Sequence, residues 1–136
     1  MTAKSGFLML LAICLLLAGC KKDAEINAAL AEVDSFTKEL VERIKAAPNL
    51  PKGVDDAQQH LDSRKREIKV KTAYLARARG IQVGDETERK MIEVVRRNQM
   101  TVIGLQSDYM SLSMSDPAFK AKLDKLVNDY LELFQA

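Results

Sequence analysis

Several residue types are scarce in this chain, and their scarcity argues against common kinds of active site. The 136 residues include no tryptophan, two cysteines and a single histidine, His60. A zinc site or a nucleophile–base pair built around histidine needs partners that one imidazole does not supply. The neighbours of His60 one helical turn away are Asp56 and Arg64, with no second imidazole. This pattern favours a solvated helix histidine over a catalytic or metal-binding one.

Short motifs for phosphate, ester or calcium chemistry are absent as well. The sequence contains no HExxH, no glycine-rich phosphate loop, no GxSxG and no EF-hand loop. Two close glycines occur in GIQVG, residues 80–84, but no strand precedes them, so they favour a turn between helices. We therefore expect a protein that is not an enzyme and that uses no cofactor or metal ion.

What the chain does have at its start is an apolar segment, FLMLLAICLLLAG, over residues 7–19. As a helix rising about 1.5 Å per residue, thirteen residues cover about 20 Å, less than the roughly 30 Å hydrocarbon core of a bilayer. One positive charge, Lys4, precedes the segment, and small residues close it. This arrangement is typical of a secretory signal peptide.

The segment ends in LAGC, residues 17–20. This motif resembles the lipobox of bacterial lipoproteins, in which leucine and two small residues precede a cysteine. The resemblance implies that residues 1–19 are removed and that residues 20–22 form a lipidated N-terminus. Cys20 would carry diacylglycerol on its thiol and an acyl chain such as palmitate on its amino group. Lys21 differs from the aspartate that retains such proteins at the inner membrane, so the expected location is the periplasmic face of the outer membrane.

Residues 23–136 are predicted to form a single helical domain. Apolar residues recur at steps of three and four in four segments, and no segment has the alternation of a strand. The turn signals between them are PNLPKG (residues 48–53), Gly80 and Pro117. These features predict an all-α antiparallel four-helix bundle, monomeric or weakly dimeric. The predicted helices cover about residues 23–47, 55–79, 86–114 and 117–135.

Three details of this bundle stay open at the level of sequence. A three-helix core with a partly detached first helix is the alternative architecture. Asp55 or Asp56 can cap the second helix, and Asp85 with Glu88 fits a capping box for the third. Asn98 interrupts an apolar seam, where it either fixes helix register or lies at the edge of the stripe.

Charge is distributed unevenly along the chain. Residues 60–97 hold eleven Lys and Arg against six Asp and Glu, whereas residues 20–59 and 98–136 are both net acidic. The candidate binding patch on the second helix comprises Arg64, Lys65, Arg66, Lys69, Lys71, Tyr74 and Arg77. The patch either pairs with the acidic helices inside the bundle, contacts an anionic envelope polymer or lipid, or binds a protein. Nucleic acid is not an expected partner of an exported, weakly basic chain.

A second apolar strip accompanies this patch. Val70, Tyr74 and Ile81 lie roughly opposite the main apolar stripe of the second helix, at about 100° per residue. Such a helix is either covered by neighbours on two sides or leaves the strip for a partner. The sequence thus predicts a lipid-anchored periplasmic binding or adaptor protein, with an envelope-polymer or anionic-lipid binding protein as the alternative.

The lipobox resemblance predicts that membrane attachment depends on Cys20. Replacing Cys20 with Ser should remove the lipid, lower the mass by that of the acyl groups and release the protein from the membrane fraction. Cell fractionation with mass spectrometry measures both effects. Unchanged mass and unchanged membrane association would contradict the resemblance.

Overall fold

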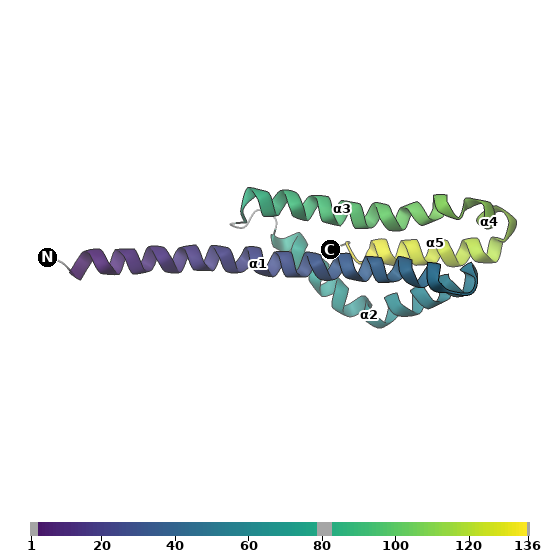
Figure 1. Ribbon diagram of the computed structural model, residues 1–136, viewed down its shortest axis with the longest axis horizontal. Helices are drawn as coiled ribbons and strands as arrows, with labels where there is room; N and C mark the ends of the chain where they lie inside the picture. The colour runs from purple at the N-terminus through teal and green to yellow at the C-terminus, as the bar shows by residue number, and fades with distance from the viewer. Residues whose placement is uncertain (1–2, 79–82, 136) are drawn as a thin grey trace.

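The protein is an antiparallel bundle of long helices (Figure 1). The computed structural model describes the backbone of residues 3–78 and 83–135, with side chains from Lys22 onward in those ranges. Its helices are α1 (Ala3–Ala46), α2 (Leu50–Ala78), α3 (Asp85–Asp108), α4 (Met110–Ser115) and α5 (Pro117–Glu132). No strand occurs among these residues, so the predicted all-α bundle is confirmed. Figure 1 shows that α1 also extends well beyond the other helices at its N-terminal end.

Each long helix has two close neighbours in the bundle. α1 packs against α2 and α3, and α5 packs against the same two helices from the other side. α2 and α3 follow one another in the chain but face each other across the diagonal of the core. Short connections favour antiparallel packing of consecutive helices, but α2 and α3 do not pack in this way. The predicted turn at residues 80–84 lies mostly outside the described residues.

The predicted apolar stripe of α1 forms the centre of the core. Its members are at most 2% exposed: Ile26, Leu30, Val33, Phe36, Leu40 and Ile44. Tyr130 of α5 is also fully buried and stacks on Phe36, with 6.3 Å between ring centroids. The predicted 23–47 helix therefore packs against the others from Ile26 to Ile44, and the alternative of a partly detached first helix is wrong.

One buried hydrogen bond joins the two diagonal helices α1 and α5. The Thr37 hydroxyl donates to the Val33 carbonyl at 2.9 Å, so the Tyr130 hydroxyl donates to Thr37 across 2.6 Å. Burial raises the pKa of Tyr130 far above its usual range, although the hydrogen bond to Thr37 opposes this. Tyr130 consequently stays a neutral donor, and its hydroxyl fixes the height of α5 against α1.

The turn between α1 and α2 is tighter than the sequence indicated. PNLPKG was expected to be a turn, but its last four residues belong to α2, which begins at Leu50. The reason is that Asn49 Oδ1 accepts from Lys52 N at 2.9 Å, and Pro51 lies in the first turn, where its missing N–H costs little. Asp55 and Asp56 therefore lie inside α2 and do not cap it.

Two further helix boundaries differ from the prediction. Gly84 precedes α3 with no side-chain cap, so the proposed Asp85–Glu88 capping box is wrong. The predicted 86–114 helix is interrupted at Tyr109, whose φ of −109° and ψ of 20° bend the chain. The Tyr109 ring meets Phe119 of α5 edge-on, with 6.3 Å between ring centroids, and α4 packs against α5.

At Gly53 the backbones of α1 and α2 approach each other closely. A Cβ at Gly53 would lie 2.5 Å from the Ile44 carbonyl oxygen, whereas a Cβ at Gly104 in α3 would meet nothing within 4 Å. Gly53→Ala should therefore lower the free energy of unfolding by about 1–3 kcal/mol through overpacking. Gly104→Ala, the matched control, should raise it by about 0.5–1 kcal/mol because alanine favours helix. Urea unfolding followed by circular dichroism measures both, and equal stabilities would contradict the close approach.

Candidate functional site

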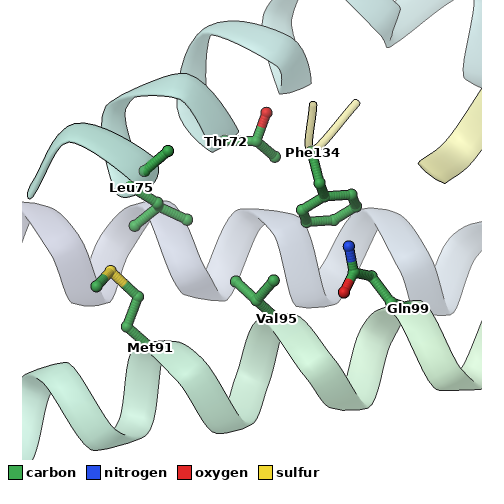
Figure 2. A pocket seen from close by; sticks show the side chains of 7 residues that line it. Thr72, Leu75, Met91, Val95, Gln99 and Phe134 are labelled. Carbon is green, nitrogen blue, oxygen red and sulfur yellow. The ribbon is translucent and has the colours of Figure 1, made fainter. Parts of the chain in front are cut away.

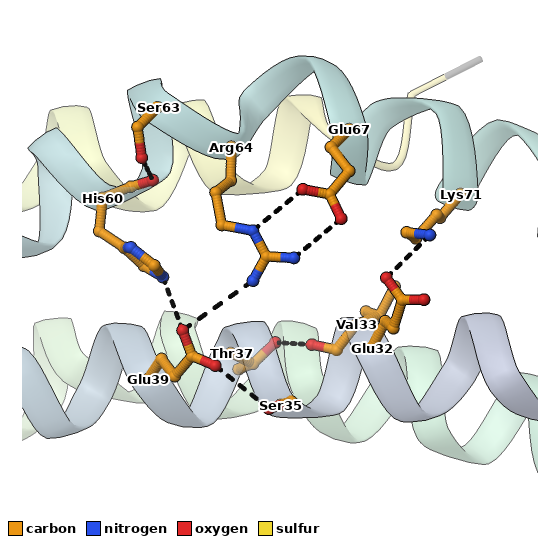
Figure 3. A network of polar contacts seen from close by, with 10 residues as sticks. All are labelled: Glu32, Val33, Ser35, Thr37, Glu39, His60, Ser63, Arg64, Glu67 and Lys71. Atoms are coloured by element: carbon orange, nitrogen blue, oxygen red, sulfur yellow. Dashed lines mark hydrogen bonds and ion pairs between the residues drawn. The ribbon is translucent and has the colours of Figure 1, made fainter.

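Three cations of the candidate patch pair with acidic side chains of the bundle, and Figure 3 shows the pairs of Arg64 and Lys71. Lys71 lies 2.8 Å from Glu32 of α1, and Lys65 lies 3.4 Å from Glu132 of α5. Arg64 donates two hydrogen bonds to Glu67 on its own helix, at 2.9 and 3.2 Å. These three cations therefore have carboxylate partners within the bundle.

Arg64 is also placed against α1. Its guanidinium lies 3.9 Å from the Glu39 carboxylate and 5.7 Å from the centre of the Phe36 ring. The hydrogen bond from Arg64 lowers the pKa of the Glu67 carboxyl, and the same bond raises the pKa of Arg64. The contacts of Arg64 thus stabilise the α1–α2 interface, and they leave this residue poorly placed to bind a partner.

The other patch residues face outward from α2. Arg66, Lys69 and Arg77 are exposed, and none of them pairs with an acidic side chain in the described part of the chain. Val70 is 66% exposed and Tyr74 is 37% exposed. At about 100° per residue, Arg66, Val70 and Arg77 fall within roughly 40° of one another around the helix. We call these five residues the outer α2 face.

The exposure of Val70 and Tyr74 decides between the two interpretations of the apolar strip. A helix covered by neighbours on two sides would bury both side chains, whereas α2 leaves both exposed. Tyr74 is partly tied down because its hydroxyl donates to Glu25 of α1 at 3.3 Å. Ile81, the third member of the strip, lies outside the described residues. The strip therefore leaves apolar side chains on the surface, among cations.

His60 is more enclosed than the sequence suggested. Its side chain is only 11% exposed, its ring stacks on Phe36 at 5.5 Å, and Nε2 lies 3.0 Å from a Glu39 oxygen. The expectation of a solvated histidine is wrong because α1 covers this side of α2. Burial and the charge of Arg43 lower the pKa of His60, and Glu39 opposes them less strongly. His60 is therefore a neutral packing residue at pH 7.

Asn98 lies inside the seam of α3, as one of the two interpretations held. It is 4% exposed, and its Nδ2 lacks a hydrogen-bond partner among the described residues. The nearby Asp34 carboxyl has a lowered pKa, chiefly because Arg97 donates to it at 2.8 Å. Asn98 lies beside a polar cleft of about 360 Å³ between α1 and α3. Asn98 also helps to lower the pKa of Asp34, which places its amide close to that carboxylate. A buried amide in an otherwise apolar seam is compatible with a residue that fixes helix register at some cost in stability.

Two other clefts flank α2. The first, of about 130 Å³, lies between α2 and α3 where α5 has ended, and Phe134 closes it (Figure 2). The Thr72 hydroxyl donates to the Leu133 carbonyl, which holds the C-terminal turn over this cleft. The second, of about 220 Å³, lies between the start of the packed part of α1 and the end of α2. Tyr74 and Arg77 of the outer α2 face line this second cleft.

No known family matches this chain, and no curated protein or solved structure does so either. Within the described residues, His, Cys, Asp and Glu form no group of three or more that could hold a metal ion. None of the helices, over that same part of the chain, is long and apolar enough to cross a membrane. The site therefore has to be interpreted from its own geometry.

The burial of His60 predicts a pH effect on stability. Because its folded pKa lies below the unfolded value near 6.5, the unfolded state binds the proton more tightly. The contribution of neutral His60 to the free energy of unfolding should thus be fully present above about pH 7.5, and it should be lost as the pH drops through 6.5. NMR can follow the ring protons of the single histidine without overlap. Glu39→Gln should lower the measured pKa further, and a wild-type pKa above 6.5 would contradict the burial.

Proposed function

We propose that this protein is a lipid-anchored adaptor of the bacterial envelope, with no enzymatic activity, that holds a partner protein near the membrane. The lipobox resemblance at Cys20 supports the anchor and a position on the periplasmic face of the outer membrane. The observation that carries the binding role is the outer α2 face. There Val70 and Tyr74 are exposed among Arg66, Lys69 and Arg77, which have no carboxylate partner in the described residues.

The contrast within α2 supports this proposal. Acidic side chains pair with Arg64, Lys65 and Lys71, whereas the cations around Val70 have no such partner within the described residues. An exposed valine between cations suits an amphipathic acidic segment, which would bury the apolar side chain and pair with the charges. Full burial of one such side chain is worth about 1.5–3 kcal/mol, and an exposed ion pair about 0–1 kcal/mol.

These magnitudes imply modest affinity in solution. A lipid anchor offsets this because it confines the protein to the membrane and raises the effective concentration at which it meets a membrane-bound partner. The proposed adaptor thus combines a surface that binds its partner weakly with permanent attachment to the membrane. Several acyl chains on Cys20 provide that attachment, since one chain alone binds only reversibly.

An envelope polymer or anionic lipid is the second candidate ligand of this face. Arg66, Lys69 and Arg77 lie within twelve residues, a rise of about 16 Å along the helix, which suits a series of anionic groups. Such binding would depend on charge alone and would weaken strongly with salt. Val70→Ser separates the two candidates, since it keeps every charge and removes the exposed apolar group. It should weaken protein binding and leave polymer binding unchanged.

The proposal predicts that charge reversal on the outer α2 face weakens binding of the partner protein. The double variant Arg66→Glu, Lys69→Glu should reduce crosslinking to the partner in intact envelopes by about tenfold, since two favourable pairs become repulsive. Membrane attachment should be unchanged. The matched control is Lys120→Glu, Lys125→Glu on α5, which makes the same change in net charge on another helix. Equal crosslinking in the two variants would assign the face to ordinary solvation.

A further inference from the structure

The cleft of about 220 Å³ at one end of the bundle has an apolar floor and a charged rim. Ile26 of α1, which is 1% exposed, forms the floor together with the partly covered Ala78 and Val83. The rim consists of exposed side chains from both helices: Lys22 and Glu25 of α1, and Tyr74 and Arg77 of α2. Apolar and cationic groups therefore converge on one small cavity.

The position of this cleft along α1 is informative. Lys22 follows Cys20 by two residues and Ile26 follows it by six, so the cleft lies about 3–9 Å along the helix axis from Cys20. The polar headgroup region on each side of a bilayer is about 5–8 Å deep. With the lipid of Cys20 in the membrane and α1 near the membrane normal, the cleft is level with the headgroups.

The residue types of the cleft suit that environment. Lysine and arginine place apolar stems along a surface while their charges reach the headgroups, and tyrosine is enriched at membrane interfaces. Arginine in particular matches the geometry of phosphate oxygens. Glu25 accepts the Tyr74 hydroxyl at 3.3 Å and offsets one of the two cations. The rim keeps one net positive charge, so an anionic headgroup fits it better than a zwitterionic one.

The cleft is small, with a volume of about 220 Å³, and one side is open to solvent. It suits a compact group, such as a phosphate with its glycerol, better than a whole acyl chain. The cleft is thus of a size for the junction between headgroup and acyl chains.

We propose that this cleft binds the phosphate and glycerol of an anionic phospholipid from the membrane that holds the Cys20 lipid. The inference rests on the lipid anchor of the proposed function and deepens it. Lys22 and Arg77 contact the phosphate, and Ile26, Ala78 and Val83 cover the first acyl carbons. A lipid held there occupies Tyr74 and Arg77 and stops the bundle from rotating about its tether. The rest of the outer α2 face, Arg66, Lys69 and Val70, then keeps one orientation above the membrane and stays available to the partner protein.

The absence of tryptophan makes a clean test possible. The full-length lipidated protein carrying Tyr74→Trp is reconstituted in vesicles of phosphatidylglycerol or of phosphatidylcholine, with brominated lipid as quencher. Quenching should be at least twofold stronger in phosphatidylglycerol. Adding Lys22→Gln and Arg77→Gln should reduce it to the phosphatidylcholine level. The control probe Met110→Trp, on α4 at the far end of the bundle, should show no quenching in either vesicle.

Each other outcome overturns the inference. Quenching could be equal in the two kinds of vesicle and unchanged by the Lys22 and Arg77 substitutions. That result would assign the cleft to an apolar occupant, such as an acyl chain of Cys20. A probe that stays unquenched on a protein whose mass shows the lipid refutes the cleft alone. Absence of the lipid from that mass refutes the anchor and the cleft together.

A second measurement on the unsubstituted protein guards against a probe variant that does not fold. Photoreactive phosphatidylglycerol should crosslink to residues 22–26 or 74–78 of the wild-type chain in vesicles, and mass spectrometry of the digest locates the adduct. A fivefold excess of unlabelled phosphatidylglycerol should compete, and the same excess of phosphatidylcholine should not. Crosslinks confined to α3 or α5 would also overturn the inference.

Discussion

Burial of the apolar side of α1 is the interaction on which the rest of the structure depends. The stripe from Ile26 to Ile44 packs against α2 and α3 and, through Phe36 and Thr37, reaches α5. Acidic residues flank this apolar stripe on α1, and two of them, Glu32 and Glu39, pair with cations of α2. The rotation of α1 therefore decides which basic residues of α2 are neutralised and which remain at the surface.

This sorting of charge changes the surface of α2 more than it changes the stability of the fold. Exposed ion pairs contribute about 0–1 kcal/mol each, little beside the burial of the core. Their effect is to reduce a long basic helix to a short outward face, where charge and apolar area coincide. The contacts that position Arg64, Lys65 and Lys71 leave Val70 and its neighbours as the exposed apolar and cationic part of α2.

The sequence predicted the fold well because heptad-like periodicity is a property of each helix alone. The ends of the helices were predicted less well. Pro51 was expected in a turn, but proline is compatible with the first turn of a helix. Tyr109 interrupts the predicted 86–114 helix where its ring contacts Phe119, and no local signal reveals this contact. The candidate residues do share one helix. Which of them are paired, and how deeply His60 is enclosed, depends on the setting of α2 against α1 and α5, and only tertiary structure provides that.

The continuity of α1 gives the tether a further property. α1 runs unbroken from Ala3 to Ala46, through the position of Cys20. The proposed cleavage before Cys20 would create a new helix end at the membrane, with its first N–H groups unbonded within the helix. The aligned peptide dipoles place about half a positive charge at such an end. Cleavage would thus place the positive end of the helix dipole beside the lipid phosphates. Acylation of the Cys20 amine would remove the formal charge of the new terminus, but the helix dipole would remain.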